Sequence, residues 1–285
     1  MPGWSAIAPG VLVPRLPLLD QTFGLVVGRD AALLVDADPT VARGDELRRG
    51  AARVARVPIG HVVSTHGHAD HCFGSGALPG ALAWGHALLP AHLRRTAADQ
   101  WAWLGETWPA LAAELQADPG AGEPGWTPRL PDRLVTDVAT IDLGGRSVEL
   151  RHLGRGHTDH DLVVIVPDAR VAFAGDLVEN GAPPQFDDAY PSEWPATVRA
   201  LLARLGPEAG WLAVPGHGDP AGLEFVRDQA AQLKAVAQLS RAVHTGQMTT
   251  EDAFDLLPFA GEFPDVARVA IERGVAELRG ELMLD

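Results

Sequence analysis

The sequence predicts a protein of the α/β class, and three consecutive features support this prediction. Residues 23–27 and 31–35 are two short apolar runs separated by turn-forming residues, as in a β-hairpin. Residues 40–56 carry alanine, leucine and charged side chains at helical spacing. Residues 61–65 then have the character of a buried strand. Strand, helix and strand in this order are typical of a layered α/β fold.

The middle of the chain, from about residue 87 to residue 128, has a different composition. Its residue pattern is that of a helix, and it contains four of the eight tryptophans, Trp101 and Trp103 among them. Proline and glycine between residues 118 and 125 interrupt this pattern and predict a loop. We expect a Trp-rich helical insert whose aromatic side chains either pack in the core or form an apolar wall for a substrate. Trp101 and Trp103 are the candidate contacts.

Strands return after the insert, and helices close the chain. Gly144-Gly145 and the segment 167–170 have the composition of hairpin loops. The expected elements are strands at 141–143, 147–150, 162–166 and 171–174, a helix at 192–205 with Ser192 as its N-cap, a strand at 211–214, and helices from about residue 221 onwards. Because no repeat or long linker interrupts the pattern, we expect one domain over residues 1–285.

The acidic composition restricts the expected partners. The 285 residues include 23 Lys and Arg against 37 Asp and Glu, which gives a formal net charge of −14. A surface of this sign repels nucleic-acid backbones and anionic lipid headgroups. We therefore expect a small-molecule substrate, with no nucleic acid and no membrane as partner. The sequence leaves the oligomeric state open.

Hydrophobicity and cysteine content predict a cytoplasmic globular protein. Apolar residues make up 46% of the chain, which is enough for a buried core and excludes disorder over most of its length. No apolar run approaches the roughly 20 residues of a transmembrane helix, and the first residues lack the features of a signal peptide. Cys72 is the single cysteine, so no intrachain disulfide can form, and we interpret it as a small buried side chain.

The segment that directly follows residues 61–65 carries the strongest chemical signal. His66, His68, Asp70 and His71 lie within six residues of each other, in the sequence His-Gly-His-Ala-Asp-His. In a loop between a strand and a helix, the first two imidazoles can converge on one metal ion, and the aspartate and third histidine can turn toward another. Histidine and carboxylate suit zinc, but also iron and manganese.

This segment resembles the HxHxDH signature of the metallo-β-lactamase superfamily. Three further motifs of that family follow in order, each at the end of an expected strand or hairpin: Gly156-His157-Thr158, Ala174-Gly175-Asp176 and Pro215-Gly216-His217-Gly218. The similarity in motif order covers residues 66–217, about half of the chain. The resemblance implies a four-layer αββα sandwich with a dinuclear metal site at one edge of the two sheets.

The resemblance also implies a role for each of these side chains. His66, His68 and His157 would bind one metal ion, Asp70, His71 and His217 the other, and Asp176 would bridge both. This is the ligand set of the glyoxalase II-like and lactonase-like branches, whereas the best-known β-lactamase subclass has a cysteine in place of Asp176. Ala69 stands where the flavodiiron branch has a glutamate, so a redox di-iron role is disfavoured. Two divalent ions are the expected cofactor, with zinc favoured over iron or manganese.

The implied function is dinuclear metal-dependent hydrolysis of a small ester, thioester, lactone or lactam. A hydroxide that bridges the ions would attack the carbonyl, and Asp70 would orient it and shuttle its proton. Three alternatives stay open: a phosphodiesterase, a mononuclear-iron sulfur dioxygenase, and a metal-holding binding module without turnover. The sequence does not identify the substrate.

Several residues near the expected ligands are candidates for secondary roles. His160 is either a contact to the ligands or the substrate, or part of an exposed loop. Asp161 could fix the tautomer of a ligand histidine by accepting its second N–H. Tyr190, the only tyrosine, lies in the breaker-rich loop 177–191 and could donate a hydrogen bond to an oxyanion.

Overall fold

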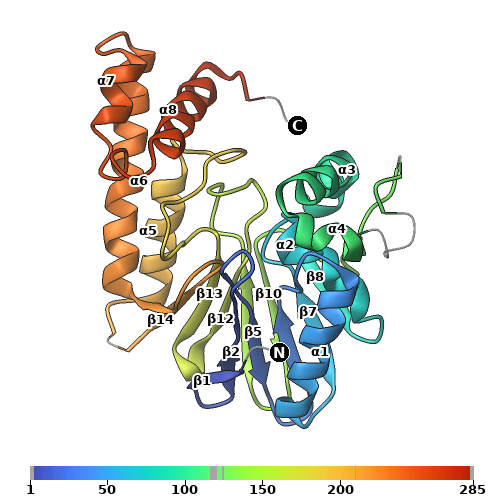
Figure 1. Cartoon of the computed structure of the whole chain (residues 1–285). Coiled ribbons are helices and arrows are strands. Elements are labelled where there is room, and N and C mark those ends of the chain that lie inside the picture. Colours follow the sequence, from blue (N-terminus) through green and yellow to red (C-terminus); the bar gives the residue numbers. More distant parts are fainter. Residues whose placement is uncertain (1–2, 116–120, 124, 209, 283–285) are drawn as a thin grey trace. The chain divides into compact units, whose positions relative to one another are not determined.

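The computed structural model describes residues 3–115, 121–123, 125–208 and 210–282 (Figure 1). Within it the chain divides into two units that alternate along the sequence. Unit 1 consists of Met1–His152 and Leu162–Phe173, and unit 2 consists of Leu153–Asp161 and Ala174–Asp285. One domain over residues 1–285 stays a prediction. Residues 118–120 and 124 of the expected loop lie outside the described residues.

The first sheet of unit 1 has the strand order β1-β2-β5-β6-β7-β8-β9. Its strands are β1 (Ser5–Ala8), β2 (Val11–Val13), β5 (Gly24–Val27), β6 (Ala32–Val35), β7 (Ile59–Val63), β8 (Leu82–His86) and β9 (Arg133–Val135). Two further short strands, β3 (Arg15–Leu16) and β4 (Gln21–Thr22), come between β2 and β5 in the sequence and pair with each other. The antiparallel pairing of β5 with β6 confirms the first hairpin. From β6 to β9 the strands are parallel, so their carboxyl ends lie at one edge of the sheet.

Helix α1 (Val41–Ala55) connects the parallel strands β6 and β7 and confirms the expected helix. It begins after Thr40, whose hydroxyl accepts a hydrogen bond from the amide of Arg43 at 3.2 Å, the ordinary geometry of an N-cap. Leu47 and Ala51 face a core cluster of unit 1 that also contains Leu34. The helix ends at Arg56, which has a left-handed conformation with φ of 59°.

A second set of strands in unit 1 forms two consecutive hairpins. β10 (Val138–Asp142) pairs with β11 (Ser147–Arg151), which pairs with β12 (Val163–Val166), which pairs with β13 (Val171–Gly175), all antiparallel. The short helix η2 (Pro167–Ala169) lies between β12 and β13. Gly144 and Gly145 in the first turn have φ of 85° and 83°, which glycine adopts readily. Both expected hairpins are confirmed.

The two sets of strands in unit 1 lie against each other. Gly24 on β5 lies so close to the ring of Phe173 on β13 that a Cβ atom at this position would overlap the ring. The amide of Asp30 donates a hydrogen bond to the carbonyl of Leu143 at 3.0 Å, which joins the two hairpin ends. The absent side chain of Gly24 therefore sets how closely the strands pack.

The insert in unit 1 is helical, as expected. It contains α3 (Leu89–Thr107) and α4 (Pro109–Leu115), which follow α2 (Ala69–Cys72), η1 (Phe73–Ala77) and β8 in the chain. The ring of Trp101 stacks on that of Phe73 with centroids 6.2 Å apart, and its centroid lies 5.1 Å from that of Trp126, within one core cluster. Trp103 is 56% exposed. Cys72 is buried in the same cluster, which confirms its interpretation as a small buried side chain.

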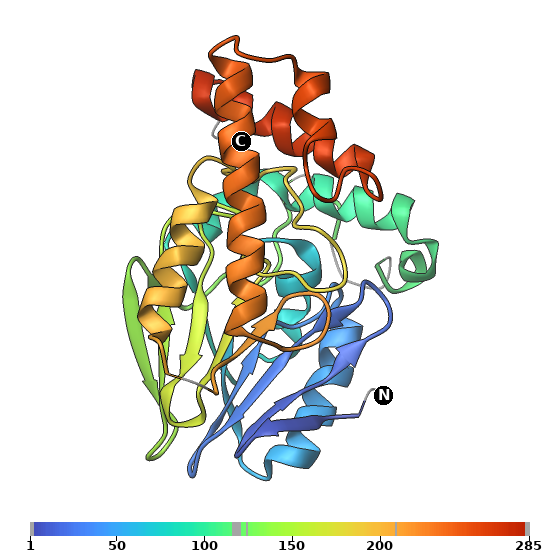
Figure 2. The same ribbon diagram turned by 90° about the vertical axis from the view of Figure 1, so that its left-hand side faces the viewer.

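Unit 2 contains most of the later helices (Figure 2). Its elements are α5 (Trp194–Leu205), β14 (Leu212–Pro215), β15 (Ala221–Gly222), α6 (Leu223–His244), α7 (Thr250–Asp255) and α8 (Pro264–Arg279). The long helix α6 contacts α5, α7 and α8. Among the described residues, no helix has the length and hydropathy needed to cross a bilayer.

The prediction of Ser192 as the N-cap of α5 is wrong. The helix begins two residues later, at Trp194, and Glu193 holds the N-cap position. Pro195, in the first turn, suits this start because it has no amide hydrogen to leave unpaired. The amide of Ser192 instead donates to Oε2 of Glu277 on α8 at 2.6 Å, a partner 85 positions away in the chain.

Candidate metal centre

The His-Gly-His-Ala-Asp-His segment of unit 1 lies directly after the carboxyl end of β7 and enters the short helix α2. His66 and His71 are each 1% exposed. The ring centroid of His66 lies 4.6 Å from that of His68 and 4.3 Å from that of His71. Oδ2 of Asp70 lies 3.5 Å from Nε2 of His71. Unit 1 therefore gathers three imidazoles and one carboxylate at the edge where its parallel strands end.

Asp36, which was not among the predicted site residues, holds this cluster in place. Its Oδ1 accepts the amide of Thr65 at 2.7 Å, and its Oδ2 lies 2.9 Å from both the Thr65 hydroxyl and Nδ1 of His71. The same hydroxyl lies 3.0 Å from Nδ1 of His66. One buried carboxylate thus fixes the rings of two histidines. Its signal in the sequence was an aspartate directly after the buried strand β6, at the same sheet edge.

Gln100 on the insert helix α3 is a second partner that the sequence did not reveal. Its Oε1 accepts the amide of Ala69 at 2.7 Å, and its Nε2 donates to the carbonyl of Gly67 at 3.0 Å. Gln21 donates in the same way to the carbonyl of Asp70 at 2.7 Å. These bonds fix the backbone on which His68 and Asp70 stand. No local pattern marks either glutamine, because their partners lie 31 to 49 positions away.

Unit 2 carries the other three predicted ligands on separate segments. His157 is in the loop 153–161, Asp176 follows β13, and His217 follows β14. Oδ2 of Asp176 lies 3.8 Å from Nε2 of His157 and 3.4 Å from Nε2 of His217. His157 and Asp176 are buried, whereas the His217 side chain is 19% exposed. Asp176 is therefore the point at which the ligands of unit 2 meet.

Asp161 plays for His157 a part similar to that of Asp36 for His71. Its carboxylate accepts the amide and the hydroxyl of Thr158, each at 2.8 Å, which closes the loop around His157. Oδ1 of Asp161 lies 3.8 Å from Nδ1 of His157. Burial lowers the pKa of His157, but Asp161 and Asp176 more than offset this and raise it to about 9. A metal ion at this ring has to displace a proton.

Glu179, three residues after Asp176, is a further buried acid that was not among the predicted site residues. It is 4% exposed and accepts a hydrogen bond from the amide of Gln185 at 3.2 Å. Burial, together with the negative charge of Asp176, raises the pKa of Glu179 to about 7. Gln229 on α6 accepts the amide of Glu179 and donates to the carbonyl of Leu177, so the loop after Asp176 is tied to α6.

The candidate substrate contacts lie in different environments. His160 is 1% exposed, and its Nδ1 lies 2.6 Å from Oδ1 of Asp159, so the alternative of an exposed loop is wrong at this position. Tyr190 is 7% exposed, with the guanidinium of Arg155 4.4 Å above its ring. Substrate contact by these residues, and by Trp101 and Trp103, stays a prediction.

The donor chemistry of these side chains fits a transition metal. All seven predicted ligands belong to groups of His and Asp that could hold a metal ion. Imidazole nitrogen and carboxylate oxygen are donors that zinc, iron and manganese accept. The orienting carboxylates Asp36 and Asp161 are the usual partners of metal-binding histidines.

Comparisons with known proteins agree with this set of His and Asp side chains. A family model described as "Metallo-beta-lactamase superfamily" matches residues 16–217. A metallo-beta-lactamase type 2 from Bacteroides fragilis is 31% identical over 100 residues, which cover 34% of this chain and 39% of that protein. A protein of the same name from Bacillus cereus is 28% identical over 200 residues, or 69% of this chain and 66% of the relative. The chain thus spans less than two thirds of the length of these curated relatives.

Solved structures share the fold. A metallo-beta-lactamase from Pontibacter korlensis superimposes with a TM-score of 0.61 at 21% sequence identity, over 82% of this chain and 99% of that one. Together with the family match, this likeness confirms the predicted αββα fold class.

Proposed function

The chain belongs to the metallo-beta-lactamase superfamily, as a metallo-hydrolase, and from this premise we propose that it is a dinuclear enzyme that hydrolyses a small carboxylic ester, thioester, lactone or lactam. The observation that carries the proposal is the construction of both ligand sets. Each unit supplies His and Asp side chains of metal-binding type, and in each unit a buried carboxylate, Asp36 or Asp161, lies beside a ligand histidine. Such support is expected where histidines bind metal.

We assign His66, His68 and His157 to one ion, Asp70, His71 and His217 to the other, and Asp176 to both. The hydrogen bonds support this assignment for two rings. Nδ1 of His71 is bonded to Asp36 and Nδ1 of His66 to Thr65, so Nε2 is the coordinating atom of each. We propose zinc as the metal, with iron and manganese as alternatives. When bound, two such ions lower the pKa of a coordinated water and polarise the substrate carbonyl.

The side chains around the ions have separate tasks. Asp70, whose side chain is 18% exposed, is positioned to accept the proton of the attacking water and to pass it to the leaving group. The hydrogen bond from Gln21 to the Asp70 carbonyl keeps the backbone of Asp70 in place. The contact of Asp36 with Nδ1 of His71 keeps Nε2 of that ring directed at the ion that Asp70 would bind. Asp176 supplies a carboxylate, which resists oxidation better than the thiolate of a cysteine at this position would.

The names of the relatives, the ligand set and the net charge support the proposed substrate class. The relatives are named metallo-beta-lactamases, so a lactam is one candidate. The ligand set resembles that of glyoxalase II-like and lactonase-like enzymes, which favours an ester, thioester or lactone. The net charge of −14 supports a small molecule rather than a nucleic acid as partner, and a cytoplasmic location agrees with the single cysteine.

Metal analysis and a substrate panel test the proposal. We expect about two zinc ions per chain and turnover of p-nitrophenyl acetate or of a chromogenic lactam that a chelator abolishes. Turnover of bis-p-nitrophenyl phosphate alone would identify a phosphodiesterase, and about one iron per chain with oxygen uptake would identify a sulfur dioxygenase. Full metal loading without any turnover would leave a binding module and would contradict the proposed function.

A further inference from the structure

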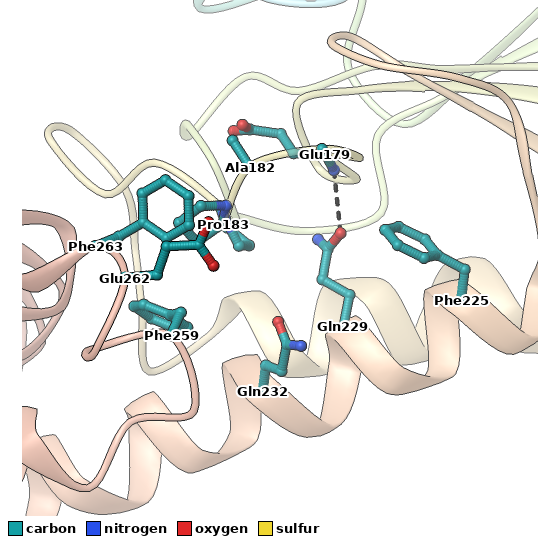
Figure 3. A pocket seen from close by; sticks show the side chains of 11 residues that line it. Glu179, Ala182, Pro183, Phe225, Gln229, Gln232, Phe259, Glu262 and Phe263 are labelled. Atoms are coloured by element: carbon teal, nitrogen blue, oxygen red, sulfur yellow. Dashed lines mark hydrogen bonds between the residues drawn. The ribbon is translucent and has the colours of Figure 1, made fainter.

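A cavity of about 210 Å³ lies entirely within unit 2 (Figure 3). Three segments line it: the loop from Glu179 to Pro184, one face of α6, and the connection between α7 and α8. An apolar cavity of about 150 Å³ accommodates benzene. This one is therefore large enough for a single ring with a short substituent, but too small for a complete drug-sized ligand.

The face of α6 toward the cavity presents Phe225, Gln229 and Gln232, at positions i, i+4 and i+7 (Figure 3). Gln229 is buried and already committed, because it accepts the amide of Glu179 and donates to the Leu177 carbonyl. Phe225 and Gln232 are half-buried. Gln232 has no hydrogen bond from its side chain to any residue in the described part of the chain. This face thus offers an aromatic ring and an available amide oxygen.

The connection between α7 and α8 supplies two more rings and a carboxylate. The amides of Glu262 and Phe263 both donate to the carbonyl of Phe259, at 3.2 and 2.8 Å, so the three residues form one turn. Phe259 stacks on Phe186 with ring centroids 6.4 Å apart. Both phenylalanines of the turn are half-buried, whereas Glu262 is exposed at the cavity.

The charge of the lining has one sign. Among the described residues, two carboxylic acids, Glu179 and Glu262, line the cavity, and no Lys, Arg or His does. Over the described ranges, neither acid forms an ion pair with a basic side chain. Phe259 and Phe263, with the carboxylate of Glu262 between them, form the kind of surface that binds an organic cation, through the ring faces and through charge attraction (Figure 3).

We propose that this cavity binds a protonated amine carried on a small apolar group, and that this group is part of the substrate. The ammonium would lie against Phe259 and Phe263, with its charge facing Glu262 and an N–H donated to the amide oxygen of Gln232, and the apolar group would extend along α6 toward Phe225 (Figure 3). An anionic group would find no basic partner in the lining. The assignment to the substrate rests on the proposed hydrolase function, whereas the binding of the amine rests on unit 2 alone.

Two links within unit 2 connect the cavity with the metal ligands. Glu179 follows Asp176 by three residues, and the amide of Asn180 donates to the carbonyl of His217 at 3.0 Å. The rings of Phe259, Phe186, Trp194 and His157 form a continuous series, with centroids 6.4, 5.3 and 5.7 Å apart. A group held in the cavity would thus contact the loop that directly follows Asp176 and is hydrogen-bonded to His217.

Binding of three matched probes to the metal-loaded protein tests the cavity. Benzylamine, which is protonated at neutral pH, is expected to bind about tenfold more tightly than neutral benzyl alcohol in calorimetry. Benzoate is expected to bind least. Glu262→Gln should remove most of the difference between amine and alcohol, and Phe225→Leu should weaken both. The control Glu272→Gln, which removes the same charge from the exposed face of α8, should bind all three as the parent does.

Equal binding of the three probes, or equal effects of Glu262→Gln and Glu272→Gln, would overturn the proposal. A probe held by the metal ions rather than by the cavity would respond to neither variant, and this result would also contradict it. Because Glu262 is exposed, its substitution leaves the fold intact, and the Phe225 variant gives an independent measurement.

The assignment to the substrate needs turnover. We expect the p-nitrophenyl ester of 4-(aminomethyl)benzoate to exceed that of 4-(hydroxymethyl)benzoate in kcat/KM by about tenfold, and the ratio to fall toward one in Glu262→Gln. If neither ester nor p-nitrophenyl acetate is hydrolysed while benzylamine still binds, the hydrolase proposal fails and the cavity remains. If both esters are hydrolysed at equal rates, only the present inference fails.

Discussion

The two units of the molecule arrange their metal ligands in different ways. In unit 1, all four predicted ligands lie within residues 66–71, on one segment that follows β7 and runs into α2. In unit 2, His157, Asp176 and His217 come from three segments up to 60 positions apart, and they meet at the carboxylate of Asp176. A contiguous motif is recognisable by itself, whereas dispersed ligands acquire meaning only from their order and from folding.

The support of the ligands differs in the same way. In unit 1 the loop is fixed from outside, since Asp36, Gln21 and Gln100 come from distant elements. In unit 2 the partner of His157 is Asp161, only four residues away. We infer that unit 1 needs its tertiary structure to orient local ligands, whereas unit 2 needs it to bring distant ligands together.

Removal of a ligand from each unit is the largest test of this comparison. We expect His66→Ala and Asp176→Ala each to lower kcat/KM for a hydrolysed ester on the order of 10³-fold, because a lost ligand removes several kcal/mol of charge stabilisation by the ions. Metal content should fall with activity. The exposed Asp255→Asn on α7 serves as control. Full metal content and activity in either ligand variant would exclude that residue from the site.

The second test concerns a buried acid in unit 1. Burial raises the pKa of Asp38 from 3.8 to about 6, although Arg43 lies 2.7 Å from its Oδ1. A raised folded-state pKa stabilises the protein below pH 3.8, and this stability is lost as the pH rises through about 6. Relative to Asp38→Asn, the wild type should therefore lose about 2 kcal/mol of unfolding free energy between about pH 4.5 and pH 7.5.

Chemical denaturation of both proteins at each pH measures this difference. Metal loss at low pH affects both proteins alike and cancels in the comparison. A constant difference between wild type and Asp38→Asn over this range would show that the carboxylate is not destabilised by burial. An unfolding transition in which only one of two phases responds would show that unit 1 unfolds separately from unit 2.

The third test compares the orienting carboxylates directly. Asp36→Asn and Asp161→Asn should each weaken zinc binding by about 10- to 100-fold, because a ligand histidine loses the negative charge of the carboxylate beside its ring. Competition with a chromogenic chelator gives the affinities. We expect the larger effect for Asp36, because its Oδ2 lies 2.9 Å from Nδ1 of His71, whereas Oδ1 of Asp161 lies 3.8 Å from Nδ1 of His157. The reverse order, with both variants folded, would contradict the view that unit 1 depends more on outside support.

The smallest expected effect belongs to Gln100. Gln100→Ala removes two hydrogen bonds to the loop of unit 1, each worth about 1 kcal/mol, and should lower kcat/KM by about three- to tenfold with retained metal. Gln100→Glu keeps an acceptor for the Ala69 amide but loses the donor to Gly67, so its effect should be different from that of alanine. The exposed Gln238→Ala on α6 is the matched control, and equal activity of all three proteins would show that the insert does not position the loop.

Local features of the fold were predictable because they depend on neighbours in the chain. The β5–β6 hairpin, α1 and the turn at Gly144-Gly145 follow from apolar periodicity and from glycine at positive φ. The position of the α5 cap was not, because the amide of Ser192 is satisfied by Glu277 from another helix. Likewise, the polar residue His160 was as consistent with an exposed loop as with the buried position it takes.

For the site, the sequence alone determined the types and the order of the candidate ligands, since a metal demands particular donor atoms wherever they lie. Only the tertiary structure decided which groups hold them, because Asp36 and Gln100 act through partners that no local pattern specifies. It also decided the existence of the cavity in unit 2. The side chains of that cavity become neighbours only when α6 and the turn before α8 pack together, and burial, which gives them their chemistry, is a property of the folded chain.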